Sequence, residues 1–124
     1  MARILVIEDD TLTREWLESL LTRNGYAVDT ASNGKQGTEM FVKSAADLVV
    51  TDIVMPEKDG IETITHLKRH NPKVKVIAIS GGERRPVGLS RHYLHSAKLI
   101  GADRAMQKPI TNEDMLAAVA ELLS

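Results

Sequence analysis

The chain has 124 residues, a net charge of −1 from 16 basic and 17 acidic side chains, and no cysteine. This length suits one domain with a core of its own. The balanced charge gives no reason to expect direct binding to nucleic acid or to a membrane. The lack of cysteine excludes disulfides, thiolate catalysis and cysteine-ligated zinc. The first apolar run, residues 4–7, is too short for a signal peptide or a membrane span, so we expect a cytoplasmic protein.

Short apolar runs alternate along the chain with longer amphipathic stretches, a pattern typical of an α/β fold with a parallel sheet. Strands are predicted, in chain order, at residues 4–7, 27–30, 48–51, 74–79 and 105–106. Apolar residues at helical spacing predict five helices, whose apolar positions lie within residues 12–21, 40–41, 61–67, 89–100 and 115–123. Asn24-Gly25 and Gly101 are expected to end helices, and Thr111 is expected to begin one. The prediction is therefore five βα units in a doubly wound sheet.

Acidic side chains follow two of the predicted strands. Glu8, Asp9 and Asp10 come directly after the first strand, and Asp52 follows the third. In the usual doubly wound order these strands are neighbours, so both groups should meet at one edge of the sheet. Converging carboxylates repel one another unless a cation neutralises them, and oxygen ligands favour Mg²⁺ over zinc. Taken alone, the three acids after the first strand fit a helix N-terminus equally well, and Asp10 in particular is expected to have that role.

Two more polar residues end the remaining strands at this edge. Ser80 closes the fourth strand and Lys108 follows the fifth. A hydroxyl and an ammonium beside an acid–metal cluster form a phosphate-binding set, because phosphoryl transfer requires mainly positioning and neutralisation of charge. Each of these residues alone would be unremarkable, and their shared position is what points to phosphate chemistry.

Taken together, these motifs resemble the receiver domains of two-component response regulators over essentially the whole chain. The matching segments are Ile4-Leu5-Val6-Ile7-Glu8-Asp9-Asp10, then Asp52 with Met55-Pro56 and Asp59-Gly60, then Ser80-Gly81-Gly82, then Gly101-Ala102-Asp103, and finally Lys108-Pro109. The resemblance implies a flavodoxin-like (βα)5 fold with strand order 2-1-3-4-5. It also implies a receiver domain over residues 1–124, with no output domain in this chain.

The resemblance implies a role for each residue of the acidic cluster. Asp52 would be the phosphoacceptor, a carboxylate nucleophile that forms an aspartyl phosphate. Asp9, Asp52 and the backbone carbonyl of Val54 would ligate Mg²⁺, for which Mn²⁺ would be a substitute. Glu8, where many relatives carry aspartate, would hold the metal through a water molecule.

The resemblance also implies the phosphate-binding residues. Lys108 would pair with Asp52 at rest and with a phosphoryl oxygen afterwards. Ser80, with Gly81 beside it, would bind the phosphoryl group as part of the switch. Pro109 would form a cis bond after the lysine and aim it inward.

Two features depart from the family pattern. Ala105 stands where relatives usually have the tyrosine or phenylalanine that moves together with the switch hydroxyl. The segment 81–88, rich in glycine with a proline, makes the chain longer than usual before the fourth helix. We therefore expect phosphate capture to be conventional, and we expect its transmission through residues 80–110 to differ from that of relatives.

The expected function is that of a phosphorylation-controlled signalling module. Its donor would be a histidine kinase or a histidine phosphotransfer protein, its downstream protein target is unknown, and a dimer through the helix 4–strand 5–helix 5 face is an option. We expect no enzyme activity beyond self-catalysed phosphoryl acceptance and slow self-dephosphorylation. Two alternatives stay open: an unphosphorylated pseudo-receiver that serves as an interaction module, and the receiver fragment of a longer DNA-binding regulator.

Overall fold

The sheet of the protein is the one expected from the sequence. The computed structural model describes residues 1–53, 60–81, 95, 97–98 and 100–124. Its parallel strands form a five-stranded sheet in the order β2-β1-β3-β4-β5, which confirms the predicted fold. The strands are β1 (Arg3–Ile7), β2 (Ala27–Ala31), β3 (Leu48–Asp52), β4 (Lys75–Ser80) and β5 (Arg104–Gln107).

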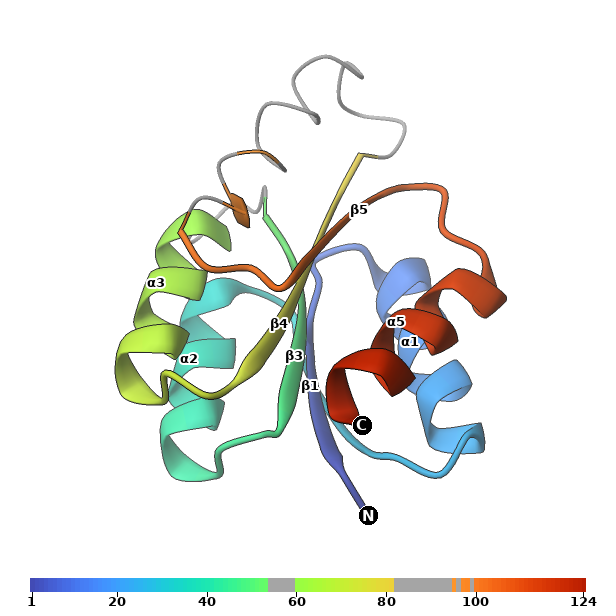
Figure 1. Cartoon of the computed structure of the whole chain (residues 1–124), viewed down its shortest axis with the longest axis horizontal. Helices are drawn as coiled ribbons and strands as arrows, with labels where there is room; N and C mark the ends of the chain where they lie inside the picture. Colours follow the sequence, from blue (N-terminus) through green and yellow to red (C-terminus); the bar gives the residue numbers. More distant parts are fainter. Residues whose placement is uncertain (54–59, 82–94, 96, 99) are drawn as a thin grey trace.

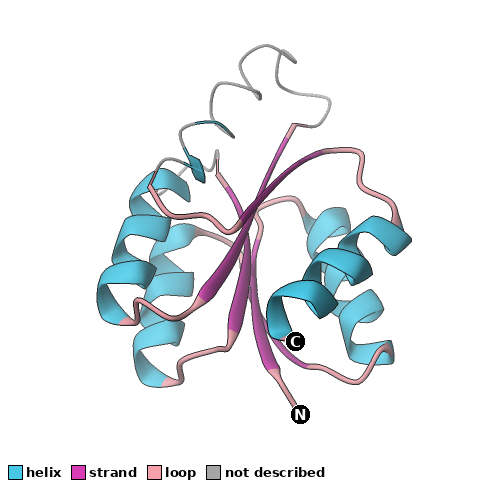
Figure 2. Cartoon of the chain, viewed as in Figure 1, coloured by secondary structure: helices cyan, strands magenta, loops and turns pink. Residues whose placement is uncertain are grey.

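Helices cover both faces of this sheet. Figure 1 shows α2 and α3 on one face and α1 and α5 on the other, and Figure 2 shows the same two helical layers around the strands. Their bounds are α1 (Thr11–Arg23), α2 (Gly34–Lys43), α3 (Gly60–His70) and α5 (Asn112–Leu123). The helix predicted at residues 89–100 lies mostly outside the described residues. No helix in the described part of the chain is both long and apolar enough to cross a membrane.

The core has one layer on each side of the sheet, as alternation along the strands requires. In β1, Leu5 and Ile7 belong to the cluster shared with Phe41 of α2, whereas Ile4 and Val6 belong to the cluster shared with α1 and α5. These four side chains, residues 4–7, are all buried, which explains why this part of β1 is continuously apolar in the sequence.

The helix ends predicted from single residues are confirmed. Gly25 follows α1 with a φ of 92°, and the Tyr26 amide donates back to the Leu21 carbonyl at 3.2 Å. Gly101 has a φ of 123°, and the Ala102 amide donates to the Ala97 carbonyl at 3.0 Å. Glycine enters this left-handed conformation without a steric penalty, so it closes helices. Thr111 begins α5 as predicted, its side chain accepting a hydrogen bond from Asp114 N at 3.1 Å.

Candidate functional site

The carboxylates predicted to converge do so at the carboxyl edge of the sheet. Glu8 and Asp9 follow β1, and Asp52 lies beside them because β1 and β3 pair with Ile7 opposite Thr51. Glu8, Asp9 and Asp52 each offer a carboxylate oxygen, and these oxygens all lie within 4.8 Å of one another. Glu8 and Asp52 are fully buried. Asp52 is the last residue of β3 rather than the residue after it, because its backbone continues the pairing with β4.

The Lys108 ammonium lies between two of these carboxylates. It donates to Glu8 Oε1 at 2.7 Å and to Asp52 Oδ2 at 3.2 Å. Its side chain is only 14% exposed, so the ion pairs are shielded from water. Pairing of the lysine with Asp52 was expected, but the shorter bond to Glu8 was not. The Lys108 ammonium therefore links the loop after β1 to the end of β3.

Burial and charge act together on the pKa values of this group. Burial raises the pKa of Glu8 to about 8, and the nearby Asp52 charge adds to the effect, although Lys108 and the Asp10 amide oppose it. For Lys108, burial lowers the pKa, but attraction to Asp52 and the contacts with Glu8 outweigh burial and leave the pKa above its usual value. The lysine is therefore charged at neutral pH, whereas Glu8 holds its proton more tightly than an exposed glutamate.

The loop that carries the acids is tied down at its start and its end. The Asp10 amide donates to Glu8 Oε2 at 3.0 Å, so both oxygens of Glu8 are engaged. The Asp10 side chain accepts from Thr13 N at 2.9 Å and begins α1, as expected for an acid at a helix N-terminus. Arg14 donates to the Glu8 carbonyl at 2.8 Å. Asp10 thus has a structural role.

The remaining predicted residues lie at the ends of β4 and β5. Ser80 is buried at the end of β4, where its carbonyl accepts from Lys108 N at 2.7 Å, and Gly81 follows directly. The Lys108–Pro109 peptide bond is cis, the geometry that the resemblance implied. Ala105 is half-buried in β5 and pairs in register with Ala78 of β4.

Two predicted features fall where the structure makes no statement. Val54, the proposed source of a carbonyl ligand, lies outside the described residues. The same holds for residues 82–88 of the extra segment. These remain predictions from the sequence.

Close packing of α3 fixes the backbone at the end of β3. A Cβ atom at Gly60 would lie 2.6 Å from the Asp52 carbonyl oxygen and closer still to the Ile53 Cα. The Gly60 amide donates to the Ile53 carbonyl at 2.8 Å, and the Ile53 amide donates to Ile79 O at 3.1 Å. Glycine is required here because any side chain would push α3 away from Asp52.

Sequence reasoning missed two residues at this edge. Arg14 contacts the acidic loop, and the buried Thr51 hydroxyl donates to the Asp52 carbonyl at 2.9 Å. A basic residue one turn after the three acids was a visible signal for Arg14. Thr51 gave no signal, because threonine is common in strands.

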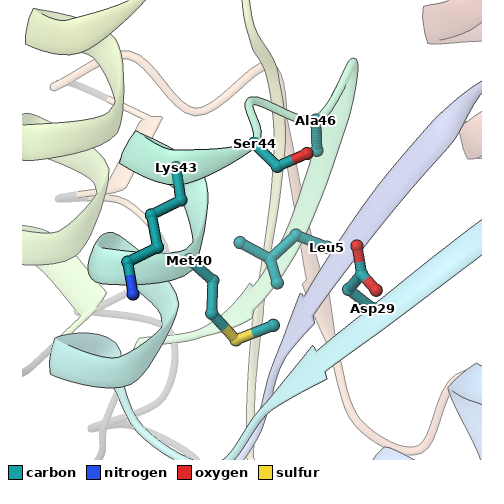
Figure 3. A pocket seen from close by; sticks show the side chains of 6 residues that line it. All are labelled: Leu5, Asp29, Met40, Lys43, Ser44 and Ala46. Carbon is teal, nitrogen blue, oxygen red and sulfur yellow. The ribbon is translucent and has the colours of Figure 1, made fainter.

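A cavity of about 220 Å³ lies near the carboxyl end of α2 (Figure 3). Its lining residues are Leu5, Asp29, Met40, Lys43, Ser44 and Ala46. None of these belongs to the acidic cluster, and Asp29 is paired with Arg3 at 3.0 Å. The cavity therefore has no part in the site.

The chemistry of the donor set fits a hard divalent cation. Glu8, Asp9 and Asp52 offer only carboxylate oxygens, which suit Mg²⁺ or Mn²⁺ rather than a soft metal. Asp9 is the most exposed of the three, so an ion can approach from its side. The buried ammonium of Lys108 supplies a second positive charge for an anionic ligand.

The receiver domain model of response regulators matches residues 4–120 of the chain. The chain belongs to this family. Receiver domains are signalling modules of two-component systems. Among curated relatives, response regulator MprA of Mycolicibacterium vanbaalenii and that of Mycobacterium leprae are each 32% identical over 98% of this receiver domain. The receiver domain spans about half the length of these relatives, 50% in each case.

Solved structures of the same family agree with the fold of this receiver domain. A receiver domain protein from Clostridium thermocellum has a TM-score of 0.88 at 28% identity, with 99% of this chain and 94% of that chain covered. Response regulator TrrA from Thermotoga maritima, solved in complex with Mg²⁺-BeF, has a TM-score of 0.84 at 29% identity, with 98% and 99% covered. The whole described sheet and its helices thus follow the receiver pattern.

Proposed function

We propose that this receiver domain accepts a phosphoryl group on Asp52 with the help of a bound Mg²⁺ ion. The observation that carries the proposal is the position of Asp52, buried at the end of β3 with the carboxylates of Glu8 and Asp9 within 4.8 Å and with Lys108 Nζ 3.2 Å away. Carboxylates and an ammonium in this arrangement can hold both a metal ion and a phosphoryl group.

In the proposed reaction a carboxylate oxygen of Asp52 attacks the phosphorus of the donor. A new O–P bond forms, and the bond from phosphorus to the donor's nitrogen or oxygen breaks, with its electron pair leaving on the donor. Lys108 stays charged and offsets negative charge on the phosphoryl oxygens. Asp9, Asp52 and, through water, Glu8 would hold Mg²⁺, which supplies neutralisation of the phosphoryl charge.

The proposed switch and partners follow from the residues around Asp52. Ser80, buried one strand away, would bind the phosphoryl group after transfer, with Gly81 beside it. The donor would be a histidine kinase or a histidine phosphotransfer protein in the cytoplasm, and the changed surface over residues 80–110 would bind a protein target. Slow self-hydrolysis of the phosphoaspartate would reset the domain.

Incubation with acetyl phosphate, with and without Mg²⁺ or Mn²⁺, tests this proposal by intact mass. Wild type should gain one phosphoryl group only with the metal, and Asp52→Asn should gain none. Asp10→Asn is the matched control, because Asn also begins helices well and Asp10 acts as a helix cap. A wild type that stays unmodified where a known receiver is labelled would favour the pseudo-receiver alternative.

The length of the relatives is consistent with one further candidate, a receiver attached to an output domain. They are about twice as long as this chain, since it covers 50% of their length. In that case phosphorylation would control an attached domain, such as a DNA-binding one, instead of a separate protein. Reading the native gene beyond the codon for Ser124 decides between these outputs, and the chemistry at Asp52 is the same in both.

A further inference from the structure

Arg14 donates hydrogen bonds to the backbone of the loop that carries Glu8 and Asp9. It lies on the first turn of α1, half-buried, and its Nη1 donates to the Glu8 carbonyl at 2.8 Å. The same nitrogen lies 3.5 Å from the Asp9 carbonyl, and Nη2 lies 3.5 Å from the Thr11 hydroxyl. One guanidinium thus contacts both peptide units that set the direction of the loop.

The two acids of this loop differ in what holds their side chains. Glu8 is fixed through its own carboxylate, by Lys108 at one oxygen and by the Asp10 amide at the other. The Asp9 carboxylate accepts no hydrogen bond from any residue in the described part of the chain, and it is partly exposed. Its placement beside Asp52 therefore depends on the backbone, which is the part that Arg14 holds.

We propose that Arg14 is a positioning residue for the divalent cation: it holds the Glu8 and Asp9 carbonyls so that the Asp9 carboxylate faces Asp52. The inference rests on the proposed Mg²⁺ site. Arg14 touches neither the metal nor the phosphoryl group. Residues that orient metal ligands from behind commonly change metal affinity by about 10–100-fold.

Because Arg14 is positively charged, the direction in which Mg²⁺ affinity changes on its removal tests the inference. A guanidinium near a cation site repels the cation, so its charge alone would weaken Mg²⁺ binding. If charge were the whole effect, removing Arg14 would tighten binding. If Arg14 acts by positioning the loop, removing it weakens binding despite the lost repulsion.

Calorimetric titration of the metal-free protein with Mg²⁺ measures this directly, with no phosphodonor present. The variants are Arg14→Gln, which loses the charge and the two-carbonyl contact, and Arg14→Lys, which keeps the charge and one donor group. Arg23→Gln is the matched control, because Arg23 lies on the same helix and donates to a backbone carbonyl, Ser19 O at 3.3 Å, in its last turn.

We expect Arg14→Gln to raise the Mg²⁺ dissociation constant about tenfold. For Arg14→Lys the dissociation constant should lie within about threefold of the wild-type value. Arg23→Gln should leave the constant unchanged or slightly tighter. Equal or tighter binding by Arg14→Gln would overturn the inference, and so would Arg14→Lys binding as weakly as Arg14→Gln. If Arg14→Gln fails to fold, Arg14→Met takes its place, because it too loses the charge and both carbonyl contacts: weaker Mg²⁺ binding supports the inference, and equal or tighter binding overturns it.

The wild-type titration separates this inference from the proposed function. Absence of Mg²⁺ binding by wild type would remove the proposed site and the role of Arg14 with it. Normal binding by wild type and by both Arg14 variants would overturn only the role of Arg14.

Discussion

Lys108 donates its shorter hydrogen bond to Glu8, at 2.7 Å, and its longer one to Asp52, at 3.2 Å. The lysine is therefore shared between two buried acids. A phosphoryl group on Asp52 would compete with Glu8 for the ammonium, and a metal ion near Glu8 would compete with the ammonium for the carboxylate. The contacts of Glu8 should therefore change both when the metal ion binds and when Asp52 is phosphorylated.

The stability of the metal-free protein should depend on pH through Glu8. Its pKa is raised from 4.5 to about 8, so the folded state binds more protons than the unfolded state between these values. The contribution of Glu8 to the free energy of unfolding must then fall as pH rises through this window. Glu8→Gln, which cannot ionise, should lose less stability than wild type over the same range. Urea denaturation in a chelator at several pH values measures the difference.

The exposed Glu18 on α1 provides the control for this experiment, since Glu18→Gln makes the same change away from the site. It should keep the wild-type pH dependence. Parallel curves for wild type and Glu8→Gln would show that Glu8 ionises normally in the folded state.

Removing the shared ammonium should destabilise the metal-free protein strongly. Lys108→Met leaves the buried Glu8 and Asp52 carboxylates without their cation, which costs about 3 kcal/mol for a broken buried ion pair. Mg²⁺ should restore more stability to this variant than it adds to wild type, because the metal replaces the lost charge. Urea denaturation with and without Mg²⁺ measures both effects.

Lys68→Met is the matched control for the loss of an ion pair. Lys68 pairs with Asp103 at 3.1 Å, with side chains 21% and 25% exposed, away from the acidic cluster. This variant should lose less stability and should gain no extra stability from Mg²⁺. A Lys108→Met protein as stable as wild type, or one indifferent to Mg²⁺, would contradict the role assigned to the ammonium.

Much of the fold could be predicted from the sequence because it is specified locally. The apolar run of β1 is buried on both faces, and Gly25 ends α1 through a backbone conformation that glycine adopts freely. The bounds of the shortest strand were predicted less well. β5 runs over Arg104–Gln107, longer than the expected 105–106, because pairing with β4 rather than an apolar run defines its ends.

The convergence of Asp9, Asp52 and Lys108 was also predictable, since parallel strands end at one edge. The details of contact were not. Whether Lys108 reaches Glu8 or Asp52 depends on side-chain lengths and on depths of burial that only the assembled sheet defines. The contact of Arg14 with the loop likewise depends on the orientation of α1 relative to the end of β1.

Gly60→Ala should disturb the site through the backbone of Asp52. The added Cβ would lie 2.6 Å from the Asp52 carbonyl oxygen, so α3 or the end of β3 must move, at a cost of about 3 kcal/mol. Mg²⁺ affinity should fall as well, because Asp52 shifts relative to Asp9. Urea denaturation and calorimetric titration measure the two effects.

Gly25→Ala separates displacement from backbone strain. Gly25 has a φ of 92° and open space within 4 Å of an added Cβ, so this variant should lose only about 1 kcal/mol from strain. Its Mg²⁺ affinity should equal that of wild type. Gly60→Ala with wild-type affinity would mean that α3 moves without disturbing Asp52.

Phosphorylation should change residues 81–100 without the rotation of an aromatic ring on β5. Ala105 pairs with Ala78 and packs against the core beside α3, so β5 has no ring at this position to transmit the event. We expect amide exchange in this segment to change when Mg²⁺ and beryllium fluoride, a phosphoryl mimic, are added. Asp52→Asn, which cannot form the acyl phosphate mimic, should show no change. Unchanged protection across 81–100 in wild type, with binding of the mimic established by calorimetry, would mean that the signal leaves the site by another route.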